Sequence, residues 1–230
     1  MAWAHVQTNG NILPGTGNTI THTYGAAVAA GDLLCCLIIC GTGFTINSVA
    51  DSVNGAWTVA KFVDGGANPG CGAIYFFPST AAGTPLVTVT FSGVVGTRRL
   101  ICSEYSGIAP AAPFDVSAGQ GQTNPGTGAD AVKSGATAAI AQANSLVYGG
   151  TRCVVTTALA VGTGFTQRFN TVSGGAAVAV EDKISGAAGS TAEATFTGDN
   201  AGADPVTVVA VFKEPAASST PRVLTMTGAG

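Results

Sequence analysis

The chain has 230 residues, of which 46% are hydrophobic and only 9% are charged, and its formal net charge is −3. Few basic residues and a negative balance exclude a typical nucleic-acid-binding protein, which needs basic patches to displace counterions from phosphate. The longest apolar run, LLCCLIIC at residues 33–40, has less than half the roughly 18 residues of a membrane span, so no membrane span is expected.

Glycine and proline punctuate short runs rich in Val, Ile, Thr, Phe and Tyr, which is typical of strands and turns. In the first part of the chain the predicted strands are residues 19–24, 33–40, 45–49, 57–63, 71–77, 86–91 and 98–105. In the second part they are residues 132–140, 146–155, 166–171, 176–184, 192–196 and 206–212. Some alternate and others are continuously apolar, which indicates an all-β protein of packed antiparallel sheets.

Several landmarks recur in the same order about 110 residues apart, which is the pattern of an internal repeat. They pair QTNGNILPGTG with QTNPGTG at residues 7–17 and 122–128, GTGFT at 41–45 and 162–166, Leu33 with Leu146, VTFSG with ATFTG at 89–93 and 194–198, and Tyr105 with Phe212. This order predicts an internal duplication. The first half, residues 1–110, and the second half, residues 111–214, would be related parts of a jelly-roll-like antiparallel β-sandwich.

Residues 215–230 have no counterpart in the repeat and begin as a Pro/Ser-rich linker. One interpretation is a frayed terminus or a strand that folds back. The other is an assembly arm that adds to the sheet edge of a neighbouring subunit through Arg222, Val223, Leu224 and Met226.

Six cysteines lie mostly in apolar, strand-like runs without the CxxC spacing of a metal site: Cys35, Cys36, Cys40, Cys71, Cys102 and Cys153. Free cysteine behaves as a small hydrophobic residue, so we expect buried thiols, with disulfides and metal binding as alternatives. Arg98 and Arg99 form an adjacent basic pair, which we interpret as a solvated strand start.

Side chains that could carry catalysis are few. His5 and His22 are the only histidines, and no recognised catalytic or phosphate-binding motif is present, so we expect no enzyme, metal or cofactor. Glu104 lies in the apolar stretch CSEYSG but has no acidic neighbour on its strand, whereas a glycosidase needs a second carboxylate about 5 to 10 Å away. We therefore interpret Glu104 as structural.

The segment DSVNGAW contains the candidate ligand-binding residues Asp51, Asn54 and Trp57, which could bind a sugar or calcium. The competing interpretation is a hairpin turn, because Asn-Gly is the strongest short hairpin signal.

The succession AGDLLCCLIIC, INSVADSVNGAWTVA, AIYFF, LVTVTFSG and LICSEYSG resembles a jelly-roll-like β-sandwich module of bacteriophage virion proteins and bacterial surface proteins. Residues 7–115 match well and residues 122–214 more loosely, and no catalytic residue is carried over. The resemblance implies an exposed structural or adhesive role.

Together these observations predict a structural virion protein, namely a capsid decoration, head-fibre, tail or baseplate component. It would be made in the host cytoplasm without a signal peptide, because MAWAHVQTNG lacks a basic start and an apolar stretch. Its partners would be copies of itself and other virion proteins. The alternative is a carbohydrate-binding or host-surface adhesion module that contacts a glycan, and a remote alternative is a glycan-cleaving enzyme.

Overall fold

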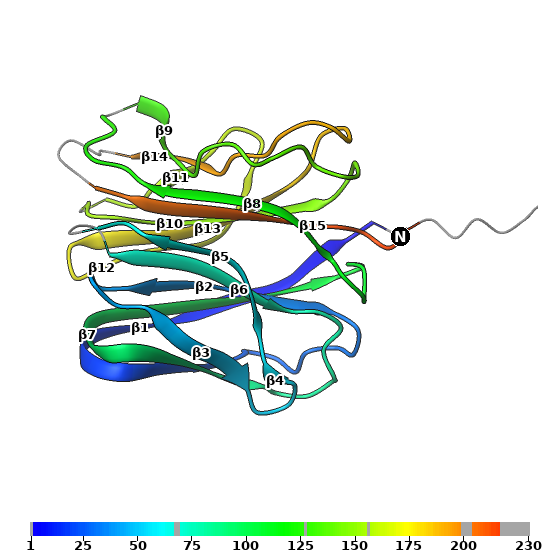
Figure 1. The fold of residues 1–230 in the computed structure, drawn as a ribbon, viewed down its shortest axis with the longest axis horizontal. Coiled ribbons are helices and arrows are strands. Elements are labelled where there is room, and N and C mark those ends of the chain that lie inside the picture. The colour runs from blue at the N-terminus through cyan, green and yellow to red at the C-terminus, as the bar shows by residue number, and fades with distance from the viewer. Residues whose placement is uncertain (1, 67–69, 127, 156, 199–203, 217–230) are drawn as a thin grey trace, which may run out of the picture.

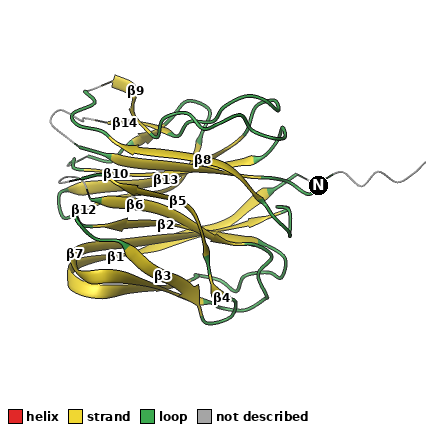
Figure 2. Ribbon diagram, viewed as in Figure 1, coloured by secondary structure: helices red, strands yellow, loops and turns green. Residues whose placement is uncertain are grey.

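The computed structural model describes residues 2–66, 70–126, 128–155, 157–198 and 204–216. Within them every strand ladder is antiparallel and no helix occurs, so the all-β prediction is confirmed (Figures 1 and 2). The strands are β1 (Ala4–Thr23), β2 (Leu33–Cys40), β3 (Ile46–Asp51), β4 (Gly55–Ala56), β5 (Thr58–Asp64), β6 (Cys71–Phe77), β7 (Leu86–Ser106), β8 (Phe114–Gly121), β9 (Gly128–Lys133), β10 (Leu146–Cys153), β11 (Ala160–Val161), β12 (Thr166–Ser173), β13 (Ala176–Ile184), β14 (Thr195–Gly198) and β15 (Val206–Phe212).

The first sheet contains strands β1 to β7 and curls into a half-barrel. Its order is β4-β3-β7-β2-β6-β5, and β1 also pairs with β7. The long strand β7 makes the curl possible, because its residues 87–91 pair with β3 whereas its residues 98–105 pair with β2. β1 follows β7 through the bend, with register shifts between residues 14 and 19.

The second half of the chain forms two sheets. The second sheet has the order β12-β13-β10-β15-β8, and the third sheet has the order β11-β14-β9. Figure 1 shows the second sheet lying between the first sheet and the third.

Three apolar clusters fill the spaces between these layers. One fills the hollow side of the first sheet, and one lies between the second and third sheets. The third, called the intersheet core here, joins the first sheet to the second and includes Leu37, Ile74, Tyr148, Val208 and Phe212.

The run LLCCLIIC explains why two clusters share one strand. In β2 the side chains of Leu34, Cys36 and Ile38 enter the hollow of the first sheet, while those of Leu37 and Ile39 enter the intersheet core. Successive side chains of a strand point to opposite faces, so a strand covered on both faces must be apolar throughout. All eight residues of β2 are accordingly buried.

The strand orders of the two halves correspond. The series β1-β7-β2-β6-β5 in the first sheet matches β8-β15-β10-β13-β12 in the second sheet, and β3-β7-β1 matches β11-β14-β9. Strand bulges match as well: β5 has a register shift between Val59 and Lys61, and β12 has one between Gln167 and Phe169. β1 and the β8–β15 pair also carry shifts near their outer ends.

Two of the repeated sequence landmarks do not occupy corresponding positions. GTGFT at 41–45 precedes β3, whereas GTGFT at 162–166 follows β11 and leads into β12. The PGTG part of the first landmark does correspond, because residues 14–17 lie at the bend of β1, while Pro125 and Gly126 lie between β8 and β9 and Gly128 begins β9. The QTN part does not, because residues 7–9 are inside β1 and Gln122 follows β8.

The predicted bounds of β2, β6, β13 and β15 are confirmed, and others are wrong for physical reasons. Residues 4–18 and 114–121 were not predicted as strands because polar and glycine residues dominate them. The predicted strand 132–140 ends at Lys133 instead, since Gly135 has a φ of +73°. The predicted break between residues 91 and 98 is a bend within β7, where neither Gly93 nor Gly96 has a positive φ.

Gly150 lets the first and second sheets approach closely. A Cβ atom at this position would lie 2.7 Å from Leu37 Cδ2 and 3.1 Å from Leu37 Cγ, well inside van der Waals contact. The Gly150→Val variant should therefore lose about 1–3 kcal/mol of unfolding free energy in urea titration.

The matched control is Gly96→Ala, because a Cβ there meets no atom within 4 Å. It should change stability by less than about 0.5 kcal/mol. The double variant Leu37→Ala/Gly150→Val should be more stable than the sum of the single losses predicts, and strict additivity would contradict the contact.

Candidate functional site

The predicted ligand residues Asp51, Asn54 and Trp57 lie together at the β3–β4 turn. Asp51 Oδ1 accepts hydrogen bonds from the backbone N–H groups of Val53 and Asn54, both at 2.7 Å. Asp51 Oδ2 accepts from Asn54 Nδ2 at 3.0 Å and from Trp57 Nε1 at 2.6 Å. Asp51 is buried, so these four bonds supply the solvation that water would otherwise give a carboxylate.

Asn54 extends this network to a neighbouring loop. Its Nδ2 also donates to Thr80 Oγ1 at 2.8 Å, and its Oδ1 accepts from the backbone N–H of Ala81 at 2.9 Å. The indole ring of Trp57 is buried in the cluster inside the first sheet. The polar atoms of the triplet thus hold the turn, the loop and the core together, and a sugar or a cation would have to displace these bonds. Ligand binding here remains a prediction, and a glycan array probed with the whole chain tests it.

Glu104 acquires an acidic neighbour that the sequence does not place beside it. Glu104 is fully buried, and its oxygens accept from Ala29 N–H at 2.8 Å and Gln7 Nε2 at 2.6 Å. Asp32 lies close enough for a side-chain hydrogen bond to Glu104. Burial, this hydrogen bond and the charge of Glu104 raise the pKa of Asp32 to about 6.

The two carboxyl groups are therefore close enough to act on each other electrostatically. Sequence spacing could not reveal the pair, because Asp32 precedes β2 while Glu104 is near the end of β7.

A second polar cluster lies at one end of the intersheet core. Tyr105 donates its hydroxyl to Asp182 Oδ2 at 2.8 Å, and Arg168 Nε forms an ion pair with the same oxygen at 2.6 Å. The His5 ring packs edge-on against Tyr105, and burial followed by the charge of Arg168 lowers the His5 pKa. These groups link β1 and β7 to β12 and β13.

A third buried acid joins the second sheet to the third. Glu181 accepts hydrogen bonds from Gly162 N–H at 2.9 Å and from Thr195 N–H at 3.0 Å. Gly162 directly follows β11, and Thr195 is the first residue of β14. Burial raises its pKa to about 8, against the opposing effect of the two N–H donors. Glu181 therefore joins β11 and β14 of the third sheet to β13 of the second sheet.

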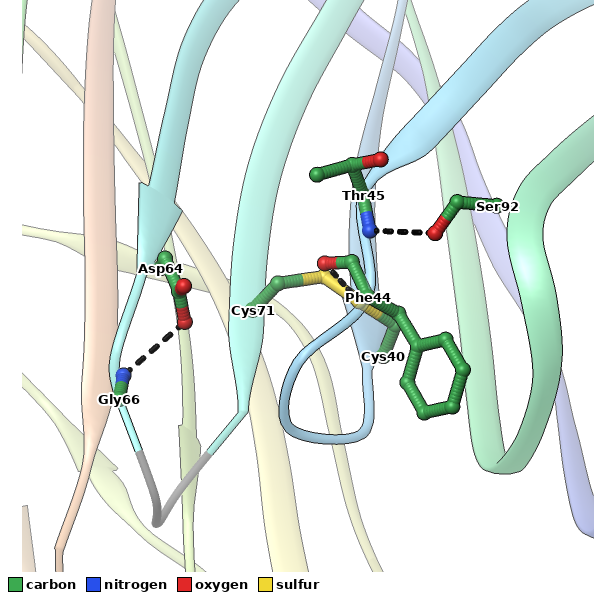
Figure 3. Close-up of a disulfide and its surroundings, with 7 residues drawn as sticks. All are labelled: Cys40, Phe44, Thr45, Asp64, Gly66, Cys71 and Ser92. Atoms are coloured by element: carbon green, nitrogen blue, oxygen red, sulfur yellow. Dashed lines mark hydrogen bonds between the residues drawn. A yellow bond between two sulfur atoms is a disulfide. The ribbon is translucent and has the colours of Figure 1, made fainter.

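The cysteines give a mixed outcome. Cys40 and Cys71, which are direct partners in the β2–β6 ladder, form a disulfide where we expected thiols, while Cys35, Cys36, Cys102 and Cys153 are buried thiols as expected. Figure 3 shows the bridge between the two strands, with Phe44 beside it. Antiparallel pairing brings the two Cα atoms to 5.1 Å, a separation that suits a disulfide and that sequence spacing does not indicate.

The interpretation of Arg98 and Arg99 as a solvated pair is wrong, because both are buried. Arg98 donates to the backbone carbonyls of Gly15, Thr16 and Thr19 and so holds the bend of β1. The arginines follow the bend of β7, and packing of the second sheet buries Arg99.

The assembly-arm residues Arg222, Val223, Leu224 and Met226 lie outside the described residues. The last described residues of the chain line a shallow hollow, together with Ala109, Ala112 and Gln142; among them is Lys213. No group of three or more metal-ligating side chains occurs among the described residues. In the same part of the chain no helix is long and apolar enough to cross a bilayer.

Comparison with known proteins adds no relative: no protein-family model, curated protein or solved structure matches this chain.

The structural role of Asp51 can be tested by Asp51→Ala. Loss of four accepted hydrogen bonds, one of them from a buried indole, should lower the unfolding free energy by about 2–4 kcal/mol in urea titration. Asp64→Ala is the matched control, because Asp64 Oδ1 accepts one exposed bond, from Gly66 N–H. If the two variants lost equal stability, Asp51 would not be the centre of the turn.

The Asp32–Glu104 pair predicts a pH dependence. The folded-state pKa of Asp32, about 6, exceeds its ordinary value of 3.8, so the native state holds this proton more tightly than the unfolded state. The resulting stabilisation is fully present below about pH 4 and is lost as the pH rises through 6. Asp32→Asn should therefore gain stability relative to the native sequence between pH 4 and pH 7, measured by urea unfolding at each pH. A constant difference between the two proteins would contradict the raised pKa.

Proposed function

We propose that this protein is a structural virion protein of a bacteriophage, which acts by packing against copies of itself and other virion proteins. One observation carries the proposal: the reactive polar side chains described above are engaged in building the fold, whereas the surface is poor in charge. Asp51, Glu104, Asp182 and Glu181 each accept internal hydrogen bonds. A protein of this design offers surface for contact rather than a set of converging catalytic groups.

Exposed apolar side chains support contact with neighbours. They are Val6, Val53, Val59, Leu86, Val94, Val154, Val172 and Ile184. Val94 and Ile184 are the most exposed, at 64% and 60%. Scattered exposed apolar residues are normal in themselves, but here only 9% of residues are charged to keep such a surface from associating.

The sheet edges suggest how neighbours would meet. β5 and β8 end their sheets, β12 ends the second sheet opposite β8, and β1 pairs only with β7. Each of these strands has a register shift in its ladder. A bulged edge is a poor template for a further strand, so we propose contact through faces and loops, with residues 222–226 as a separate arm.

We further propose that the chain is a duplicated jelly-roll-like module. The matching strand orders and bulges support this, and so does the contact between Leu37 and Gly150. Leu37 and Gly150 occupy equivalent positions in the two halves. Leu37 pairs with Ile101, four residues before Tyr105, and Gly150 pairs with Val208, four residues before Phe212. A residue that contacts its own counterpart lies on the axis of a two-fold arrangement.

The ends of the intersheet core support the same arrangement. At one end Phe76 contacts Phe212, and Phe114 packs near both rings. At the other end, Asp182 takes the register position of Phe76, Tyr105 that of Phe212, and His5 that of Phe114. The Tyr105–Asp182 hydrogen bond replaces the Phe76–Phe212 contact. The same geometry is thus filled once by apolar rings and once by a polar cluster.

Self-association is the test of the proposed function. Analytical ultracentrifugation and negative-stain imaging over a range of concentrations should show ordered oligomers of the whole chain. Val94→Lys and Ile184→Lys should weaken association at least tenfold, because each places a charge on an exposed apolar position. Thr42→Lys adds the same charge at an exposed polar position and is the control.

A chain ending at residue 214 tests the arm separately. Weaker association of this shorter chain would assign a role to residues 215–230. A whole chain that stays monomeric at every concentration and does not bind phage particles would overturn the proposed function.

A further inference from the structure

A buried arginine, Arg99, and a half-buried one, Arg152, lie near each other at the edge of the intersheet core. Arg99 is on β7 beside Ile39 of β2, and Arg152 is on β10 beside Val206 of β15. Ile39 and Val206 belong to the intersheet core, so each ladder presents one arginine and one aliphatic side chain to the space between the first and second sheets.

The two aliphatic side chains meet each other over Gly72: a Cβ atom there would lie 3.0 Å from Val206 and 3.7 Å from Ile39. The two arginines are also close enough to act on each other electrostatically. The Ile39–Val206 pair is thus an ordinary apolar contact, whereas the neighbouring Arg99–Arg152 pair brings two like charges together.

Arg99 is left with unmatched donors. Its side chain is 2% exposed, and Nη2 donates to the Ser173 carbonyl oxygen at 2.7 Å. Nε and Nη1 are buried and have no hydrogen-bond partner among the described residues. Unsatisfied donors on a buried charged group are costly, because the group has lost water without gaining an acceptor.

The charges around Arg99 do not compensate it. Burial and the neighbouring Arg152 lower the pKa of Arg99 to about 10, and no carboxylate contributes to this shift. Asp204 precedes β15 and acts, together with Arg152, on the Cys153 thiol, so this acid lies on the Arg152 side of the pair. Asp182, which pairs with Arg168, is on β13 four residues beyond Val178, the ladder partner of Arg152.

We propose that Arg99 and Arg152 bind a small oxyanion, such as phosphate, between the first and second sheets. Guanidinium groups present several N–H donors in a plane, a geometry that matches the oxygens of phosphate, and an anion would offset the buried positive charge of Arg99. The anion would accept the hydrogen bonds that Arg99 Nε and Nη1 have available. It would also link β7 of the first half to β10 of the second half and so strengthen the junction between the sheets.

Phosphate-dependent stability tests the site. Thermal unfolding of the whole chain is measured in rising sodium phosphate at constant ionic strength, with sodium chloride as the balance. The native sequence should show a saturable rise in Tm, because an anion that binds only the folded state stabilises it. Arg99→Met and Arg152→Met should lower the apparent phosphate affinity at least tenfold.

The variants also separate a ligand site from a structural hydrogen bond. Without phosphate, Arg99→Met should unfold at the same temperature as the native protein or higher, since it removes a buried charge with unmatched donors. Lys133→Met, which removes an exposed charge on β9, is the control and should keep the full phosphate response. Phosphate also stabilises proteins in general by exclusion from their surfaces, but that effect is not saturable and is equal in all variants.

Isothermal titration of phosphate into the native chain gives an independent result that does not depend on any variant folding. Saturable binding at one site per chain supports the proposal, as does loss of the phosphate-dependent rise in Tm in Arg99→Met or Arg152→Met. No detectable binding to the native chain, or an equal Tm rise in native and Arg99→Met proteins, overturns it.

Discussion

The fold depends on burial of apolar surface between the first and second sheets. β2, β10 and β15 lie at the centre of this packing and are covered on both faces, and the sequences of β2 and β15 are accordingly apolar at nearly every position. Close approach of the sheets requires residues without a side chain, and Gly72, Gly119 and Gly150 supply them where a Cβ would meet an atom of the facing sheet at 3.0 Å or less. The outer faces of the same two sheets carry the other two apolar clusters, against which Trp57 of the Asp51 turn and the third sheet pack.

Charge inside the molecule follows the same constraint. With so few ionisable groups, the chain places several of them where strands must be tied together rather than on the surface. Asp51 closes a hairpin, Glu181 joins two sheets, and Asp182 connects β13 to Arg168 and to Tyr105 across the intersheet core. Each of these acids has donors for its oxygens, as a buried carboxylate requires. Arg99 departs from this pattern, which is why the proposed oxyanion site lies there.

The two ends of the intersheet core show how one geometry can accept different chemistry. The Phe76, Phe114 and Phe212 rings pack at one end, and His5, Tyr105 and Asp182 take the corresponding register positions at the other. An apolar cluster gains stability from area alone, whereas a polar cluster is stable only when every donor and acceptor is matched. The polar end is therefore more sensitive to pH and to substitution, since protonation of His5 adds a charge beside Arg168.

The sequence by itself determined the all-β class and the strands whose side-chain pattern is strong, such as β2, β6, β13 and β15. It also placed Asp51, Asn54 and Trp57 in one turn, because these residues are neighbours along the chain. The tertiary structure decided the features that depend on pairing between distant residues. Strand β8 and residues 4–18 of β1 are such features, because backbone hydrogen bonds define them and their side chains show no strand pattern. The Cys40–Cys71 disulfide is another. It likewise decided that Asp32 meets Glu104 and that Arg99 is buried facing Arg152. Local patterns record which face of a strand is apolar, but only the stacking of sheets determines which polar groups lose water and which partners they meet.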